Sequence, residues 1–116
     1  MNVFLDDHRP CPKGFVLAKT LEECIALLEE YEVDVLSLDY DLGWGEPNGL
    51  DVARCMVERG LYAKEIYLHS SSMSGRYQMY QLLSRHVPEG TLLWCHPVPE
   101  QRLKAIRQAC ERGETE

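Results

Sequence analysis

Residues 33–43 read VDVLSLDYDLG, an apolar run that leads into an aspartate and a glycine-containing loop. Residues 33–38 are rich in Val and Leu, which is typical of a central parallel strand that is buried on both faces. The run ends at Asp39, and apolar residues then recur at helical spacing over residues 50–57, before Gly60. This pattern predicts a strand, a loop and a helix, with Asp39 at the carboxyl end of the strand.

The same alternation of strand-like and helix-like runs continues on both sides of this stretch. It predicts strands at residues 2–5, 15–18, 33–38, 65–68 and 91–95, and helices at about 21–31, 50–59, 74–85 and 99–111. Thr20 and Glu23 form a capping-box pattern before the first of these helices. The order indicates an α/β protein with a doubly wound, mostly parallel five-stranded sheet that lacks the helix between its first two strands.

The missing helix leaves the second strand open to two interpretations. Only about eight residues, 7–14, separate it from the first strand, and they include Pro10 and Pro12. A parallel crossover usually needs a dozen residues or more. The second strand therefore either runs antiparallel at the sheet edge or follows an unusually tight connection. One face of the sheet should be thinly covered, and a second copy of the chain in a homodimer would cover it.

Composition limits the function more than it defines it. The 116 residues carry a formal net charge of -7, which disfavours non-specific nucleic-acid binding and anionic membranes. No run is long and apolar enough for a membrane span, and no secretory signal is visible, so we expect a cytoplasmic protein. The five cysteines lack C-x-x-C spacing, which predicts free thiols. We expect one domain over residues 1–112 and a disordered acidic tail over residues 113–116.

The residues at the predicted carboxyl ends of the strands are mostly acidic or titratable. Ligands of open α/β sheets bind at these ends. The residues found there are Asp6, Asp7, Asp39, His69, Ser70 and His96. Several carboxylates in one partly dehydrated pocket repel each other, and a hard cation such as Mg²⁺ relieves that repulsion.

These motifs resemble bacterial response-regulator receiver domains, which have a flavodoxin-like fold. The resemblance is carried by VFLDD at residues 3–7, DVLSLDYDLG at 34–43, Ser70, and the X-Pro pair at His96. It implies that Asp6, Asp7, Asp39 and the backbone carbonyl of Asp41 hold Mg²⁺ or Mn²⁺. It also implies that Asp39 accepts a phosphoryl group and that Ser70 contacts the phosphate.

Three motifs are more similar to a divergent branch, the cyclic-phosphate-processing receiver-like domains. They are L-D-D-x-R-P at residues 5–10, L-S-L-D-x-D-L-G at 36–43 and H-S-x-x-x-x-G-R-x-x-M at 69–79. This similarity implies hydrolysis of a cyclic phosphate in a nucleotide or RNA-end product. The chain departs from the expected patterns at His96, where receivers have lysine, at Tyr40, where we expect His, and at Ser72, where we expect Asn.

The leading hypothesis is a metal-dependent phosphoesterase for a small phosphorylated ligand. In it, His69 is the acid/base, because an imidazole exchanges protons near neutral pH. Arg9 and Arg76 bind phosphate oxygens, together with Ser72 and the backbone amides of the following helix start. The alternatives are a receiver phosphorylated on Asp39 and a catalytically silent interaction module.

Two of these residues, and one further residue in the loop after Asp39, also have simpler interpretations. His69 can be a structural histidine, and Arg9 can pair with the acidic side chains. Trp44, in the loop after Asp39, either stacks on a base or folds back over the pocket edge.

Overall fold

Five strands form one parallel sheet in the computed structural model, which describes residues 1–114. The strands are β1 Asn2–Leu5, β2 Val16–Ala18, β3 Val35–Leu38, β4 Glu65–Leu68 and β5 Leu92–Trp94. Their order is β2-β1-β3-β4-β5, which is the order of doubly wound, flavodoxin-like folds. The predicted fold class is confirmed, and the strand order reverses between β1 and β3.

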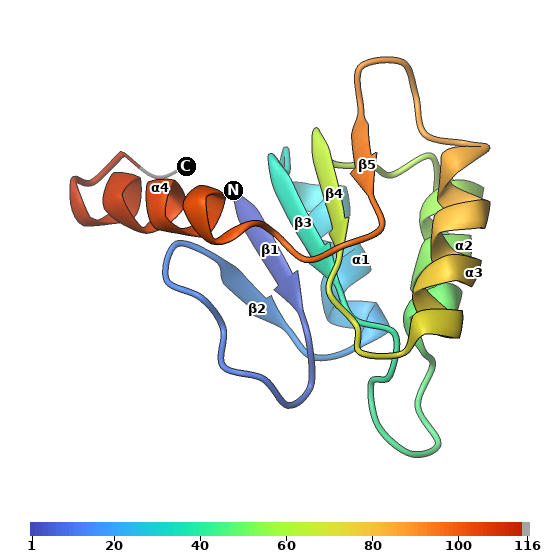
Figure 1. Cartoon of the computed structure of the whole chain (residues 1–116). Coiled ribbons are helices and arrows are strands. Elements are labelled where there is room, and N and C mark those ends of the chain that lie inside the picture. Colours follow the sequence, from blue (N-terminus) through green and yellow to red (C-terminus); the bar gives the residue numbers. More distant parts are fainter. Residues whose placement is uncertain (115–116) are drawn as a thin grey trace.

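Four helices cover the two faces of the sheet unequally. They are α1 Leu21–Glu30, α2 Gly49–Arg59, α3 Met73–Ser84 and α4 Glu100–Glu111. Helices α1, α2 and α3 lie on one face and α4 lies alone on the other (Figure 1). Among the described helices, none is long and apolar enough to cross a membrane.

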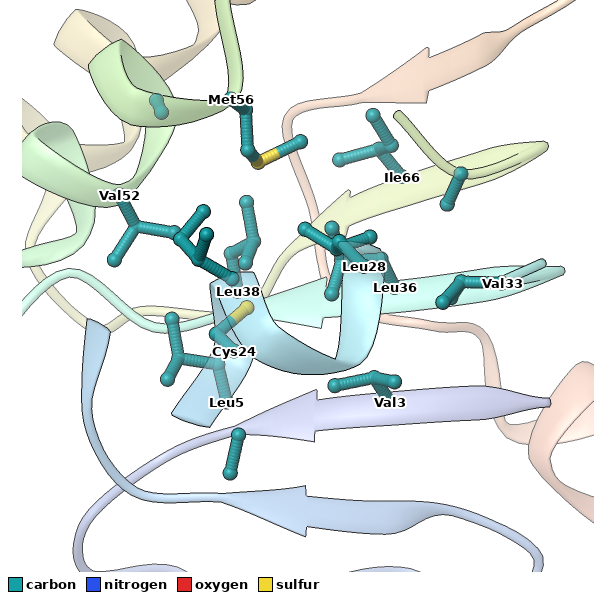
Figure 2. Packing of buried hydrophobic residues seen from close by; sticks show 14 of the residues in the cluster. Val3, Leu5, Cys24, Leu28, Val33, Leu36, Leu38, Val52, Met56 and Ile66 are labelled. Atoms are coloured by element: carbon teal, nitrogen blue, oxygen red, sulfur yellow. The ribbon is translucent and has the colours of Figure 1, made fainter. Parts of the chain in front are cut away.

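The main core lies between the sheet and helices α1 to α3. Figure 2 shows Leu5, Leu36 and Leu38 of the strands packing toward Cys24 and Met56 of the helices. Side chains alternate between the two faces of a strand. The residues that alternate with these apolar ones, such as Ser37, therefore point to the opposite face of the sheet. Asp6 and Asp39 follow β1 and β3 directly, and by the same alternation they also lie on that opposite face.

Strand β2 is parallel to β1. Of the two predicted alternatives, the unusually tight parallel connection is therefore correct, and the antiparallel edge strand is wrong. The Asp6 side chain folds the chain back, because its Oδ1 accepts hydrogen bonds from the backbone N–H groups of His8 and Arg9 at 2.9 and 3.0 Å. Gly14 ends the turn with a φ of +94°, and a Cβ there would lie 2.7 Å from Cγ2 of Ile106. Only glycine meets both conditions without strain.

The connection over residues 6–15 takes the place of the missing helix. Helix α4 packs through Ile106 onto Val35 and Tyr67, together with Val98 from the segment just before the helix. The residues after β1 cover the same face of the sheet near the carboxyl end of β1, where Arg9 donates a hydrogen bond to Asp6. The predicted homodimer across this face stays a prediction.

The chain end after α4 is only partly described. Gly113 and Glu114, which fall in the predicted disordered tail, both donate backbone hydrogen bonds to the end of α4. Residues 115–116 of that tail lie outside the described residues.

Candidate active site

A cleft of about 770 Å³ opens at the carboxyl ends of the strands. Its walls come from the β1–β2 connection, the β3–α2 loop and the β4–α3 loop. The lining residues are Asp7, His8, Arg9, Asp39, Tyr40, Asp41, Gly43, Trp44, Gly45, Glu46, Asn48, Ser70, Ser71 and Ser72. The cleft lies where the strand order reverses, as the sequence predicts.

Asp6 lies beneath the cleft as a fully buried carboxylate with four hydrogen bonds. Besides the two backbone donors, its Oδ2 lies 2.9 Å from Nη1 of Arg9 and 2.9 Å from Nε2 of His69. Burial alone would raise the pKa of Asp6, but the hydrogen bonds from Arg9, His8 and His69 outweigh it and lower the pKa to about 2. Asp6 is therefore ionised at neutral pH, and each of its two oxygens already accepts two hydrogen bonds from the protein.

Asp39 has the opposite electrostatic environment. It is 4% exposed, and its Oδ1 accepts a hydrogen bond from the backbone N–H of Tyr40 at 2.8 Å. Burial and the negative charge of Asp6 raise its pKa. The nearest cation is Arg9, whose Nη1 lies 3.3 Å from Oδ2 of Asp39. Arg9 thus pairs with the acidic side chains, as its simpler interpretation predicts, because its guanidinium bridges the carboxylates of Asp6 and Asp39.

His69 lies below the cleft floor and does not line it. Its side chain is 6% exposed, stacks on Phe4 at 4.4 Å between ring centroids, and has Nδ1 2.6 Å from Oγ of Ser37. Burial lowers the pKa of His69, although the hydrogen bond to Asp6 opposes the effect. An ionised Asp6 only accepts hydrogen bonds, so Nε2 carries the proton and Nδ1 accepts from Ser37. Both ring nitrogens are engaged inside the protein.

The β4–α3 loop brings a row of serines to the cleft. Ser70 is buried, and its Oγ accepts a hydrogen bond from the backbone N–H of Ser72 at 3.1 Å. Ser72 is the N-cap of α3 and accepts from the N–H of Gly75 at 3.1 Å. Arg76 is not among the residues lining the cleft. Its Nε is buried without a hydrogen-bond partner among the described residues.

Tyr40 fixes the β3–α2 loop against the start of α3. Its ring lies directly over Gly75, where an added Cβ would overlap the ring atoms. The Tyr40 hydroxyl also accepts a hydrogen bond from Nδ2 of Asn48 at 3.3 Å. Tyr40 thus replaces the expected histidine with a packing residue on the cleft wall.

The chemistry of the lining residues suits a hard cation. Asp7, Asp39, Asp41 and Glu46 line the cleft, against one guanidinium, that of Arg9. Asp6, Asp39 and His69 also offer ligand atoms within 4.8 Å of one another, but Asp6 and His69 are hydrogen-bonded to each other. Of the oxygen donors that the resemblance assigns to a metal, those of Asp7, Asp39 and Asp41 belong to residues that line the cleft, and such ligands fit Mg²⁺ or Mn²⁺.

Strand β5 brings no lysine to the cleft. His96, at the position where receivers have lysine, is exposed, and its Nδ1 donates to the carbonyl of Pro97 at 2.7 Å. Within the described part of the chain, no lysine lines the cleft. The cationic side chain that pairs with Asp6 and Asp39 is instead Arg9, in the β1–β2 connection.

Two further residues lie at or near the site without having been assigned to it from the sequence. Ser37 holds His69, and its only signal is a polar residue in the middle of the apolar run LSL. His8 lines the cleft, and its position follows from the fold of the β1–β2 connection, which the sequence does not specify.

The comparisons with known proteins agree with this arrangement. The family described as "Cyclic-phosphate processing Receiver domain" matches residues 1–85, which extend from β1 through α3 and contribute every residue that lines the cleft. A comparison with curated proteins gave no match. Because the match covers well over half of the chain, this protein belongs to the family of cyclic-phosphate processing receiver domains.

Proposed function

We propose that the protein is a metal-dependent phosphoesterase that hydrolyses a cyclic phosphate in this cleft. In the reaction, water adds to phosphorus, one ring P–O bond breaks, and the departing oxygen takes up a proton to become a hydroxyl group. The product is a phosphate monoester. The observation that carries the proposal is the shared cleft wall formed by Asp7, Asp39, Asp41 and Ser70, in a chain of this family.

Asp7, Asp39 and the backbone carbonyl of Asp41 would hold the divalent cation. When bound, such an ion supplies Lewis-acid stabilisation of charge on the phosphoryl oxygens. Asp6 is placed among the metal ligands by the resemblance, but it accepts four hydrogen bonds from the protein. We assign it the role of holding the connection that carries Asp7, His8 and Arg9.

Arg9 and the β4–α3 loop would bind the phosphate. The side chain of Arg9 is 40% exposed and lies at the cleft, so its remaining N–H groups can reach an anion. Ser70 and Ser72 line the opposite wall at the start of α3. Arg76 is not on the cleft wall, and we leave it out of the binding set.

We assign proton transfer to His8 and not to His69. Both nitrogens of His69 are hydrogen-bonded inside the protein, so its role is to position Asp6. The exposed imidazole of His8 lines the cleft, and its backbone N–H is fixed on Asp6 at 2.9 Å. Imidazole can donate a proton to a departing alkoxide near neutral pH.

Phosphorus NMR of cyclic phosphates incubated with the protein and Mg²⁺ or Mn²⁺ tests the proposal. We expect conversion to a monoester that is lost in Asp39→Asn and on chelation by EDTA. Asp34→Asn makes the same exchange at the other end of β3 and should retain activity. A parallel incubation with acetyl phosphate tests the receiver alternative. A stable mass increase on Asp39 without turnover of any cyclic phosphate would overturn the phosphoesterase.

A further inference from the structure

Trp44 is the most exposed large apolar side chain of the described residues, at 101% of its reference surface. It lies in the β3–α2 loop, which projects beyond the carboxyl ends of the strands (Figure 1), and it lines the cleft. It does not fold back onto the protein, which was one of the two interpretations of its position in the sequence. The other tryptophan, Trp94, is partly buried and stacks on Tyr67 at 4.8 Å.

Trp44 lies between two glycines whose backbone conformations other residues rarely adopt. Gly43 and Gly45 flank it with φ values of +111° and +79°. A Cβ added at Gly45 would meet no atom within 4 Å, whereas one added at Gly43 would lie 3.3 Å from Oδ2 of Asp7, so Gly43 holds this end of the loop beside the cleft. A fully exposed indole between two such glycines forms no contact that stabilises the fold. Its large flat surface is available to a ligand.

The cleft is much larger than a cyclic phosphate group requires. Its volume of about 770 Å³ equals the space of roughly 25 water molecules in the liquid. Asp39, proposed to hold the metal, and Ser70 and Arg9, proposed to bind the phosphate, lie near the strand ends, whereas Trp44 lies on the loop outside them. The space between them has room for the part of a substrate that is not phosphate.

We propose that Trp44 is a stacking platform for a planar ring attached to the cyclic phosphate, and that it selects nucleoside cyclic phosphates over ring-free ones. The inference rests on the proposed function and adds to it the residue that recognises the organic part of the substrate. Stacking on an aromatic side chain strengthens binding by roughly ten- to a hundredfold per base, and it accepts every base because each base has a π face. Discrimination among bases by Trp44 should therefore be weak.

The test compares a nucleoside 2′,3′-cyclic phosphate with glycerol 1,2-cyclic phosphate, which has no planar ring. Trp44→Ala should raise KM for the nucleoside substrate by about tenfold and leave KM for the glycerol compound unchanged, since about 1.4 kcal/mol corresponds to tenfold. Trp44→Phe should restore most of the loss. Tyr31→Ala removes another exposed aromatic ring, at the C-cap of α1, and should change neither KM.

Fluorescence gives a readout that does not depend on turnover. The nucleoside compound should quench the emission of the wild-type protein and of Asp39→Asn, but not of Trp44→Phe, and the glycerol compound should quench none of them. Equal loss for both substrates in Trp44→Ala, or quenching that persists in Trp44→Phe, would overturn the inference while leaving the phosphoesterase intact. Absence of turnover with both substrates would overturn the phosphoesterase, and ring-specific quenching would then still support Trp44.

Discussion

Asp6 and Asp39 follow neighbouring strands and lie on the same face of the sheet, but their pKa values are shifted in opposite directions. Asp6 is surrounded by donors that lower its pKa to about 2. Asp39 has one backbone donor and faces the charge of Asp6, so its pKa is raised. A carboxylate whose ionisation the fold disfavours is a common feature of functional sites. The raised pKa supports the proposed role of Asp39 in the reaction, and the four hydrogen bonds to Asp6 support its proposed role in holding the β1–β2 connection.

Exchanging each aspartate for asparagine should change stability in opposite directions. Asp6→Asn loses a charge that four donors surround, and the lowered pKa of Asp6 corresponds to about 2–3 kcal/mol of stability at neutral pH. Asp39→Asn removes a repulsion but keeps an acceptor for the N–H of Tyr40, so it should stabilise the fold by up to about 1 kcal/mol. Urea unfolding at pH 7 with EDTA measures both. Equal destabilisation by the two variants would contradict the assignment.

Arg9 acts as the counter-ion of both carboxylates in the absence of metal. Arg9→Met keeps much of the side-chain length but leaves Asp6 and Asp39 without their guanidinium. We expect a lower Tm in EDTA, and a larger rise in Tm on adding Mg²⁺ than the wild type shows, because the cation replaces the lost charge. Arg59→Met, at an exposed ion pair with Glu29, is the matched control and should behave as wild type. A smaller Mg²⁺ effect in Arg9→Met would show that Arg9 supports the metal instead of substituting for it.

The sequence predicts that the three aspartates lie together, but not how the side chains around them point or that Arg76 lies off the cleft wall. Asp6, Asp7 and Asp39 are placed at one edge because parallel strands end together. The sequence does not show that the ring of His69 turns under the cleft onto Ser37 and Phe4, since that depends on a rotamer and on the packing of the other face. The double pairing of Arg9 likewise depends on the turn that Asp6 makes.

At the scale of elements, the contact between the β3–α2 loop and α3 depends on one glycine. A Gly→Ala change inside a helix usually stabilises it by up to about 1 kcal/mol. At Gly75 the added methyl group would overlap the Tyr40 ring, and such overpacking costs about 1–3 kcal/mol. Gly75→Ala should therefore destabilise the protein.

Thermal unfolding in a double-mutant cycle checks this sign reversal. In a Tyr40→Ala background the methyl group has room, so Gly75→Ala should become neutral or stabilising. Ser74→Ala, at an exposed position of the same helical turn, serves as the control. Stabilisation by Gly75→Ala in the wild-type background would refute the close packing of Tyr40.

The elements themselves follow closely from the sequence, but three strands are shorter than predicted: β2 begins at Val16, the central strand β3 begins at Val35, and β5 spans only Leu92–Trp94. All nine are predicted, and the helix bounds differ by one residue or so at either end, because capping residues such as Thr20 and Gly60 mark them. Strand β5 is shorter than predicted: its ladder with β4 covers Leu92, Leu93 and Trp94, although the N–H of Leu68 still donates to the carbonyl of His96 at 3.1 Å. The direction of β2 could not be predicted, because loop length alone did not reveal the hydrogen bonds by which Asp6 turns the chain.

For the whole molecule, His69 should dominate the dependence of stability on mildly acidic pH. Its pKa in the folded protein is lowered, so the unfolded chain binds its proton first, and stability is lost as the pH falls below about 6.5. Asp6 contributes with the same sign, but only between pH 3.8 and about 2. Asp39 has the opposite sign, since its pKa is raised and its ionisation reduces stability as the pH rises above 3.8.

We therefore expect the free energy of unfolding to fall between pH 7 and pH 5. His69→Gln should remove most of that slope, whereas His96→Gln, at an exposed histidine, should keep it. Denaturant titrations across this range measure the slope directly. An unchanged slope in His69→Gln would contradict a neutral, buried His69.

Manganese binding followed by electron paramagnetic resonance tests the central claim most directly, because free Mn²⁺ loses signal when it enters a protein site. The claim is that Asp39 and its neighbours form a cation site at the carboxyl edge of the sheet. We predict one Mn²⁺ site in the wild-type protein, its loss in Asp39→Asn, and its retention in Asp34→Asn. An undiminished free signal with the wild-type protein, or equal binding by Asp39→Asn, would contradict it.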